Sequence, residues 1–145
     1  MNKNIEEILK KEQVFCSTTV GISMFPMLRN RRDTIIISKC SGRLKKYDVP
    51  LYKRGEEYIL HRIVEVRPND YVIIGDNCIQ KEYVTDEQII GVLTGFYRGG
   101  KRVDMSGWKY RTYVRVWCVL YPMRCWYKKG KRFLGCMKRK VFKHT

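Results

Sequence analysis

The stretch "EYILHRIVEVR", residues 57–67, indicates the fold class of the whole chain. It is rich in β-branched and aromatic residues, as β-strands are. Strict alternation places four side chains on one face: Tyr58, Leu60, Arg62 and Val64. The opposite face carries the three residues between them: Ile59, His61 and Ile63. We therefore expect one continuous strand here, with His61 on its second face.

Four more runs of the same kind surround this stretch. "DTIIISK" and "YDVPLYKR" precede it, while "DYVIIGD" and "QIIGVLTGFYR" follow it. Turn-forming segments separate the runs: "SGRLKK", "RGE", "RPND" and "RGGK". No segment between them is long enough for the helix of a βαβ crossover. The pattern predicts a mainly β fold, a coiled or barrel-like antiparallel domain.

Helical patterns flank the predicted β domain. "NIEEILKKE" near the N-terminus can form two helical turns. After "RGGKRVD", apolar and aromatic residues recur every three or four positions: Tyr110, Tyr113, Val114, Trp117, Leu120 and Tyr121. Pro122 is expected to break or kink this helix. We therefore expect a leader helix (1–17), a β domain (18–105) and a basic, aromatic helical tail (106–145), so that short helices stand at both ends of the domain.

The positive charge of the chain is concentrated in its last third. The formal net charge of the 145 residues is +16. Residues 1–97 hold 15 Lys and Arg against 13 Asp and Glu, whereas residues 98–145 hold 15 against the single Asp104. The excess is thus +2 in the first part and +14 in the second. The length suits one globular domain, and the tail is the part that favours an anionic partner.

The composition argues against several classes of protein. The longest stretch without charged residues, 13–28, has sixteen residues, fewer than the roughly 20 apolar residues of a spanning helix. The N-terminus lacks the apolar core of a secretory signal. We expect a cytoplasmic protein, with a peripheral position at the inner face of the membrane as an alternative. The six cysteines have no CxxC spacing and only two histidines are present, so we expect free thiols and no metal or cofactor.

The segment "GISMFP", residues 21–26, contains the most suggestive hydroxyl group. Ser23 could act as a nucleophile, Gly21 would leave room for a substrate backbone, and the Ser23 N–H could stabilise an oxyanion. A serine needs a base that takes its proton, and His61 is the only histidine inside the chain. The alternative is structural, with Ser23 as a turn residue and His61 as a half-buried strand residue. Spacing alone does not decide, because the two residues lie 38 positions apart.

Four sequence boxes, in order, resemble those of the signal peptidase I and LexA-like serine peptidases. "GISMFPMLRNRRDTIII" resembles the serine box, G-x-S-M-x-P followed by Leu and by an Asp that opens a strand. "KKYDVPLY", "YILHRIVEV" and "YVIIGDNC" resemble the next three boxes, and the resemblance covers about residues 18–97. His61 followed by Arg62 is similar to the eukaryotic and archaeal type of signal peptidase, which has His where the bacterial type has Lys. The resemblance implies a LexA- and signal-peptidase-like coiled antiparallel β domain.

The resemblance also implies catalytic roles. The nucleophile falls on Ser23 and the general base on His61, so that a peptide bond would be cleaved through an acyl-enzyme. An acidic residue would hold the far imidazole nitrogen. Asp76 of "GDN" is the first choice for it, and Glu82 is the second because the family commonly has an Asp at that position. The substrate would be an extended peptide with small residues beside the scissile bond.

Some positions depart from the family pattern. Asp33 and Asp48 follow Arg and Tyr where the family has Gly, and we expect them to form turns or strand starts. Gly21 stands where some members have a Ser that adds an oxyanion donor. The family's N-terminal membrane anchor is missing, which puts the removal of secretory signals in doubt. The alternative is a non-catalytic relative that binds peptide, membrane or nucleic acid, and a cysteine nucleophile is a third hypothesis.

Aromatic residues are interleaved with the cations of the tail: Trp108, Tyr110, Tyr113, Trp117, Tyr121, Trp126, Tyr127, Phe133 and Phe142. Through residues 108–145 the tail suits an anionic membrane surface, where such rings lie at headgroup level and cations contact lipid phosphates. Nucleic acid is the less favoured partner and would use the cations on phosphates and the rings for stacking. The interpretation that we favour over both partners is structural: 110–121 packs onto the β domain and the last residues form a solvated tail.

Overall fold

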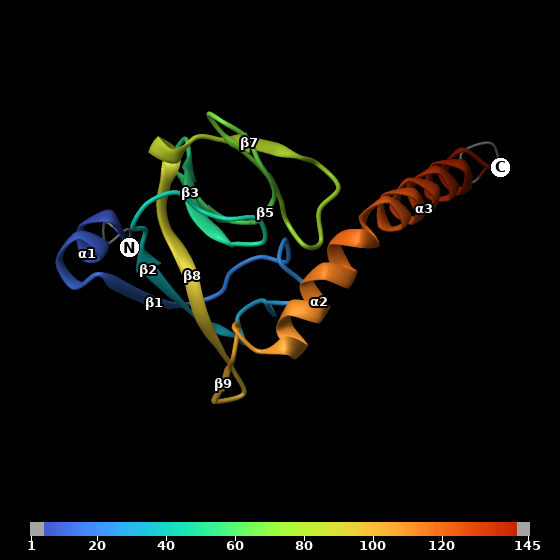
Figure 1. Cartoon of the computed structure of the whole chain (residues 1–145). Helices are drawn as coiled ribbons and strands as arrows, with labels where there is room; N and C mark the ends of the chain where they lie inside the picture. The colour runs from blue at the N-terminus through green and yellow to red at the C-terminus, as the bar shows by residue number, and fades with distance from the viewer. Residues whose placement is uncertain (1–4, 142–145) are drawn as a thin grey trace.

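The computed structural model describes residues 5–141 and has a mainly β, antiparallel architecture (Figure 1). The fold class predicted from the sequence is therefore confirmed. A strongly curved β domain is followed by two helices that leave it on one side. Residues 1–4 and 142–145, which include Phe142 and the ends of the expected leader and tail, lie outside the described residues.

The strands form two antiparallel sheets. The larger sheet has the strand order β1-β2-β8-β3-β4, with β9 added to the end of β8. Its strands are β1 (Val14–Thr18), β2 (Thr34–Lys39), β8 (Ile89–Arg98), β3 (Pro50–Arg54), β4 (Glu57–Leu60) and β9 (Lys101–Val103). The smaller sheet consists of β5 (Arg62–Val66), β6 (Tyr71–Ile74) and β7 (Glu82–Val84), and η1 (Asp86–Gln88) leads from β7 into β8.

The prediction of one continuous strand over 57–67 is wrong, because the chain passes from one sheet to the other at His61. Leu60 at the end of β4 pairs with Leu51 in the larger sheet, whereas Arg62 pairs with Ile74 in the smaller one. His61 is the single residue between β4 and β5, and its side chain is buried. The catalytic base predicted from the sequence therefore lies at the junction of the two sheets.

The leader is part of the β domain. Residues 14–18 form β1, which pairs with β2 in a continuous antiparallel ladder from Val14 opposite Ser38 to Thr18 opposite Thr34. The preceding helix α1 (Ile5–Glu12) buries Leu9 in the main core. The expected boundary between residues 17 and 18 therefore falls inside a paired strand. β1 is missed in the sequence because its Cys, Ser and Thr give no apolar alternation.

Two hydrophobic clusters hold the sheets together. The main cluster includes three residues from the turn that follows Ser23: Met24, Met27 and Leu28. The second cluster lies between the sheets and contains Tyr52, Ile63, Tyr71, Ile73 and Val84. Burial of the three turn side chains fixes the backbone that carries Ser23, since each removes a large apolar surface from water.

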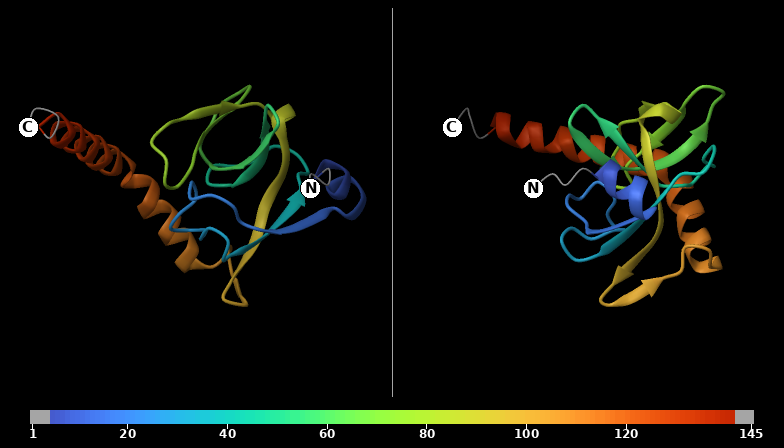
Figure 2. Two further views of the ribbon diagram at one scale, coloured as in Figure 1. Left: turned by 180° about the vertical axis from the view of Figure 1, so that it is seen from behind. Right: turned by 90° about the vertical axis from the view of Figure 1, so that its left-hand side faces the viewer.

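The tail forms helices α2 (Trp108–Val119) and α3 (Tyr121–Val141). The helix expected over 110–121 ends just before Pro122, as the sequence predicts, but Pro122 is also the second residue of α3. A proline is tolerated there because the first turn of a helix needs no N–H donor at that position. α2 packs on the β domain through Tyr110, Tyr113 and Val114. The first turns of α3 also contact the domain through Arg124 and Lys128, and the rest of the helix extends away from it (Figure 2).

Candidate active site

The turn that carries Ser23 is tied at its base. The Thr19 N–H donates to Asp33 O at 3.0 Å, and the Thr19 hydroxyl donates to Arg29 O at 2.8 Å. Gly21 has φ +99°, a conformation that L side chains rarely adopt, and its N–H donates to Asn30 Oδ1 at 2.9 Å. The backbone conformation thus explains the glycine directly, and the space in front of it is also open.

A second segment, residues 75–79 between β6 and β7, clamps the same turn. The Asn77 N–H donates to Ser23 O at 2.7 Å, and Asn77 Nδ2 donates to Ile22 O at 3.2 Å. Among the described residues, the Ser23 N–H has no protein acceptor. It is thus free to donate to another group.

Glu82, and not Asp76, contacts the imidazole of His61. His61 Nδ1 lies 3.3 Å from Glu82 Oε1 and 3.1 Å from the Tyr52 hydroxyl. The same hydroxyl donates to Glu82 Oε2 at 3.0 Å, and Arg54 Nη1 donates to that oxygen at 3.1 Å. A carboxylate on Nδ1 favours the tautomer with its proton on Nδ1, which leaves Nε2 as a proton acceptor. Glu82, the second candidate from the sequence, is therefore the carboxylate that contacts His61.

The surroundings of His61 keep the imidazole neutral near pH 7. Burial lowers its pKa below the ordinary value of 6.5, although the charge of Glu82 acts in the opposite direction. Burial, reinforced by Glu82, also raises the pKa of Tyr52, which therefore remains a phenol that can donate to the carboxylate. A neutral imidazole with a free Nε2 has the protonation state that a general base requires.

Gly75 lies where the serine turn, the base and a thiol meet. The position that a Cβ of residue 75 would take is 2.8 Å from Ser23 O, 2.8 Å from Cys78 Sγ and 2.9 Å from His61 Nε2. The backbone of Ser23 and the reactive nitrogen of His61 are thus neighbours. Among the described residues, no hydrogen bond joins the Ser23 hydroxyl to the imidazole, and Nε2 has no other protein partner. Such contacts often tighten only when substrate binds.

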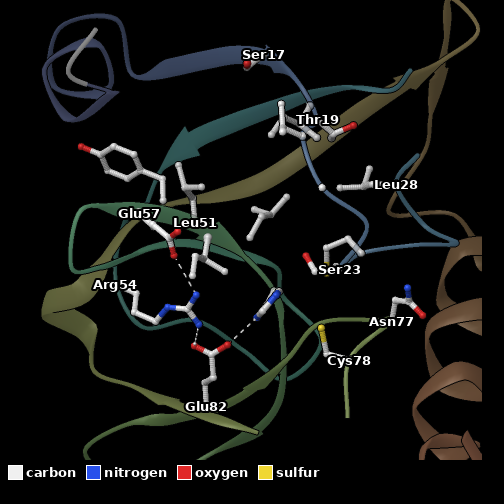
Figure 3. Close-up of a pocket in the computed structure, with 18 of the residues that line it drawn as sticks. Ser17, Thr19, Ser23, Leu28, Leu51, Arg54, Glu57, Asn77, Cys78 and Glu82 are labelled. Atoms are coloured by element: carbon white, nitrogen blue, oxygen red, sulfur yellow. Dashed lines mark hydrogen bonds and ion pairs between the residues drawn. The ribbon is translucent and has the colours of Figure 1, made fainter. Parts of the chain in front are cut away.

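Ser23 and His61 open onto one cleft of about 960 Å³. Figure 3 shows Ser23, Asn77, Cys78 and Glu82 around it. Edge strands of the larger sheet contribute to two sides, through Phe15 and Ser17 of β1 and through Tyr58, Ile59 and Leu60 of β4. Lys128 and Arg132 of α3 lie at its margin. The cleft is therefore large enough for several residues of a peptide and is bordered by residues of both edge strands, to which an extended chain could pair.

Asp76 holds a different partner. Its two carboxylate oxygens accept from Arg62 Nε and Nη2, both at 2.8 Å, and both residues are almost completely buried. The Tyr113 hydroxyl of α2 donates to Asp76 Oδ2 at 3.2 Å, and Trp117 Nε1 donates to Asp76 O at 2.9 Å. The prediction that Asp76 contacts the imidazole of His61 is therefore wrong. Through these hydrogen bonds Asp76 connects α2 to the segment that holds the Ser23 turn.

Asp33 and Asp48 stabilise turns, as the sequence predicts. The Asp33 carboxylate accepts a hydrogen bond from the Arg29 N–H at 3.0 Å, and the Asp48 carboxylate accepts one from the Lys45 N–H at 2.8 Å.

Tyr52 and Cys78 were not predicted as site residues, since nothing in their spacing marks them. Burial raises the pKa of Cys78, which keeps it a thiol and makes it a weak nucleophile.

No family model matches the chain, and no curated protein matches it. None of the helices between residues 5 and 141 combines the length and apolar character needed to cross a membrane. Over the same residues, no group of three or more His, Cys, Asp and Glu could hold a metal ion.

Replacing Gly75 with Ala should reduce the reactivity of Ser23. The added Cβ would overlap the Ser23 carbonyl and His61 Nε2, so one of them must move, and a displacement of about 1 Å can cost roughly a hundredfold in rate. The rate of Ser23 acylation by a p-nitrophenyl ester, followed by the release of p-nitrophenolate, would measure the effect. Gly95→Ala is the matched control, because a Cβ there meets neighbours only at 3.5 Å or more. Equal acylation rates in both variants would contradict the described geometry.

Proposed function

We propose that the chain is a serine peptidase in which Ser23 is the nucleophile, His61 the general base and Glu82 the residue that orients the base. The observation that carries the proposal is the environment of His61. Its Nδ1 lies 3.3 Å from a carboxylate, while Nε2 is free and lies next to the Ser23 turn. This is the division of roles between two imidazole nitrogens that a serine hydrolase requires.

The mechanism begins when a peptide lies in the cleft with its carbonyl carbon near Ser23 Oγ. His61 Nε2 takes the hydroxyl proton as Oγ attacks, and the Ser23 N–H donates to the oxyanion. Glu82 stabilises the imidazolium. His61 then gives the proton to the leaving amine as the C–N bond breaks. Water, deprotonated by the same nitrogen, attacks the acyl ester and releases Ser23 with its proton restored.

The edge strands support an extended substrate. β1 and β4 are the two edges of the larger sheet, and both contribute residues to the cleft. An extended peptide can add main-chain hydrogen bonds to an exposed strand edge, while alternate side chains enter pockets. Small residues beside the scissile bond, which the family resemblance implies, would allow the carbonyl to approach Ser23 closely. The proposed substrate class is therefore an extended peptide or an unfolded protein segment.

A peptide library tests the proposed activity. Digestion by the intact chain should produce cleavage products, whereas Ser23→Ala should produce none. Cys78→Ala serves as the control because its thiol lies in the same site but takes no part in the proposed reaction. Products that persist with Ser23→Ala, or that disappear with Cys78→Ala, would contradict the assignment of the nucleophile. A chain that binds library peptides without cleaving them would support the non-catalytic alternative.

A further inference from the structure

One face of α3 is apolar and exposed. Its exposed members are Met123, Trp126, Tyr127, Phe133, Leu134 and Met137, and the pair 133–134 follows the pair 126–127 by seven positions, about two helical turns. Trp126 is 81% exposed, and Phe133 and Leu134 are 65% and 60% exposed. At this spacing the side chains form a single stripe along the helix. An exposed apolar stripe of this size on a charged helix marks an interaction surface.

The opposite edge of α3 is cationic and contacts the β domain. Arg124 donates to Asp76 O, and Lys128 Nζ donates to Asn77 Oδ1 at 2.8 Å. Arg132, one turn further on, lies at the margin of the cleft. These three cations follow one another at four-residue steps, so they share one side of the helix. The apolar stripe therefore points away from the domain, along the part of α3 that extends freely in Figure 2.

We propose that the apolar stripe of α3 docks this protein on an anionic lipid surface. Trp, Tyr, Phe and Leu on one face, with Lys and Arg beside them, are the composition of a helix that lies in the membrane interface. Lys129 and Lys131 are exposed beside the stripe. The excess charge of +14 in residues 98–145 complements anionic headgroups, and each cation near such a surface contributes roughly 1 kcal/mol.

Charge and chemistry disfavour the other occupants. A second copy of the chain would bring two tails of the same strong positive charge together, which repel each other. Nucleic acid would need cations at the centre of the contact and flat rings beside them. Half of the stripe instead consists of side chains without a ring, Met123, Leu134 and Met137, on which bases cannot stack. The hydrocarbon of a lipid bilayer matches the apolar stripe, and its anionic headgroups match the cations beside the stripe.

Docking would place the cleft close to the lipid. Lys128 and Arg132 lie at the cleft, and the apolar stripe lies on the far side of the same helix. A helix with its side chains is about 10–12 Å across. The entrance of the cleft would thus lie within about one helix diameter of the bilayer, where peptides that emerge from or adhere to a membrane are accessible. The docking itself does not depend on the proposed peptidase activity.

Flotation with vesicles tests the docking. The intact chain should float with vesicles of equal parts phosphatidylcholine and phosphatidylglycerol, less so in high salt, and not with phosphatidylcholine alone. Trp126→Ser combined with Leu134→Ser removes apolar surface without changing charge, and it should weaken binding at least about tenfold. Val66→Ser combined with Tyr83→Ser, at exposed positions of β5 and β7, should bind like the intact chain.

Ser23→Ala should also bind the vesicles normally, which separates docking from catalysis. Circular dichroism would show that the double variants are folded, as exposed substitutions allow. Equal flotation of the two double variants would overturn the proposal, as would binding to neutral vesicles as strong as to anionic ones. Absence of flotation together with tight binding to duplex DNA or RNA would overturn it in favour of a nucleic-acid surface.

Discussion

Glu82→Gln should lower the rate of Ser23 acylation by about 10²- to 10⁴-fold. The substitution keeps the shape of the side chain but removes the charge that lies 3.3 Å from His61 Nδ1. Without that charge the imidazolium of the transition state loses its stabilisation, and the amide no longer selects the tautomer that leaves Nε2 free. The rate of acylation by a p-nitrophenyl ester measures this loss without knowledge of the natural substrate.

Glu57→Gln is the matched control for this prediction. Glu57 lines the same cleft and accepts from Arg54 Nη2 at 3.1 Å, as Glu82 accepts from Arg54 Nη1, but it does not contact the imidazole. Its substitution should leave the acylation rate nearly unchanged. Similar losses in both variants would mean that the cleft needs negative charge in general and that Glu82 has no special relation to His61.

The pH profile of acylation distinguishes a role through His61 from a merely structural one. Acylation requires neutral imidazole, and the lowered pKa places the acid limb of the profile below pH 6.5. The carboxylate of Glu82 favours the protonated ring, so Glu82→Gln should move that limb to still lower pH. A limb that stays in place or moves upward would contradict the assigned contact.

Asp76→Asn should destabilise the fold strongly. It leaves the buried guanidinium of Arg62 without its charged partner, and breaking a buried ion pair in this way costs about 3–5 kcal/mol of unfolding free energy. Urea unfolding measures the loss. Asp70→Asn is the control, because it breaks the exposed pair with Arg67 and should change the free energy of unfolding little. Equal effects in the two variants would contradict a structural role for Asp76.

The sequence predicts the participants at the site better than their contacts. Ser23 and His61 are identified from their residue types and from the order of the boxes, and the structure brings the serine turn and His61 Nε2 together at Gly75. Whether Asp76 or Glu82 contacts His61 depends on the side of the extended chain to which the His61 side chain points. Adjacent residues point to opposite sides, so His61 and Arg62 meet different carboxylates. Arg62 takes Asp76, and His61 takes Glu82.

The fold class follows from the β-branched runs, whereas the sheet junction does not. Alternation over 57–67 continues smoothly through His61, and only pairing with distant strands divides the stretch into β4 and β5. Strand pairing is decided by contacts far apart in sequence, which local periodicity does not contain. β1 is lost for a similar reason, since its ladder with β2 stabilises a segment with a weak intrinsic pattern.

The most direct test of the Ser23–His61 assignment is covalent labelling by a fluorophosphonate, with the modified residue located by peptide mass spectrometry. We expect one adduct on Ser23 in the intact chain and in Cys78→Ala, and none in Ser23→Ala. His61→Ala should react only at a strongly reduced rate, because no other described histidine can take the hydroxyl proton. Labelling of equal strength in the intact chain, Ser23→Ala and His61→Ala, or an adduct on Cys78, would contradict the proposed peptidase.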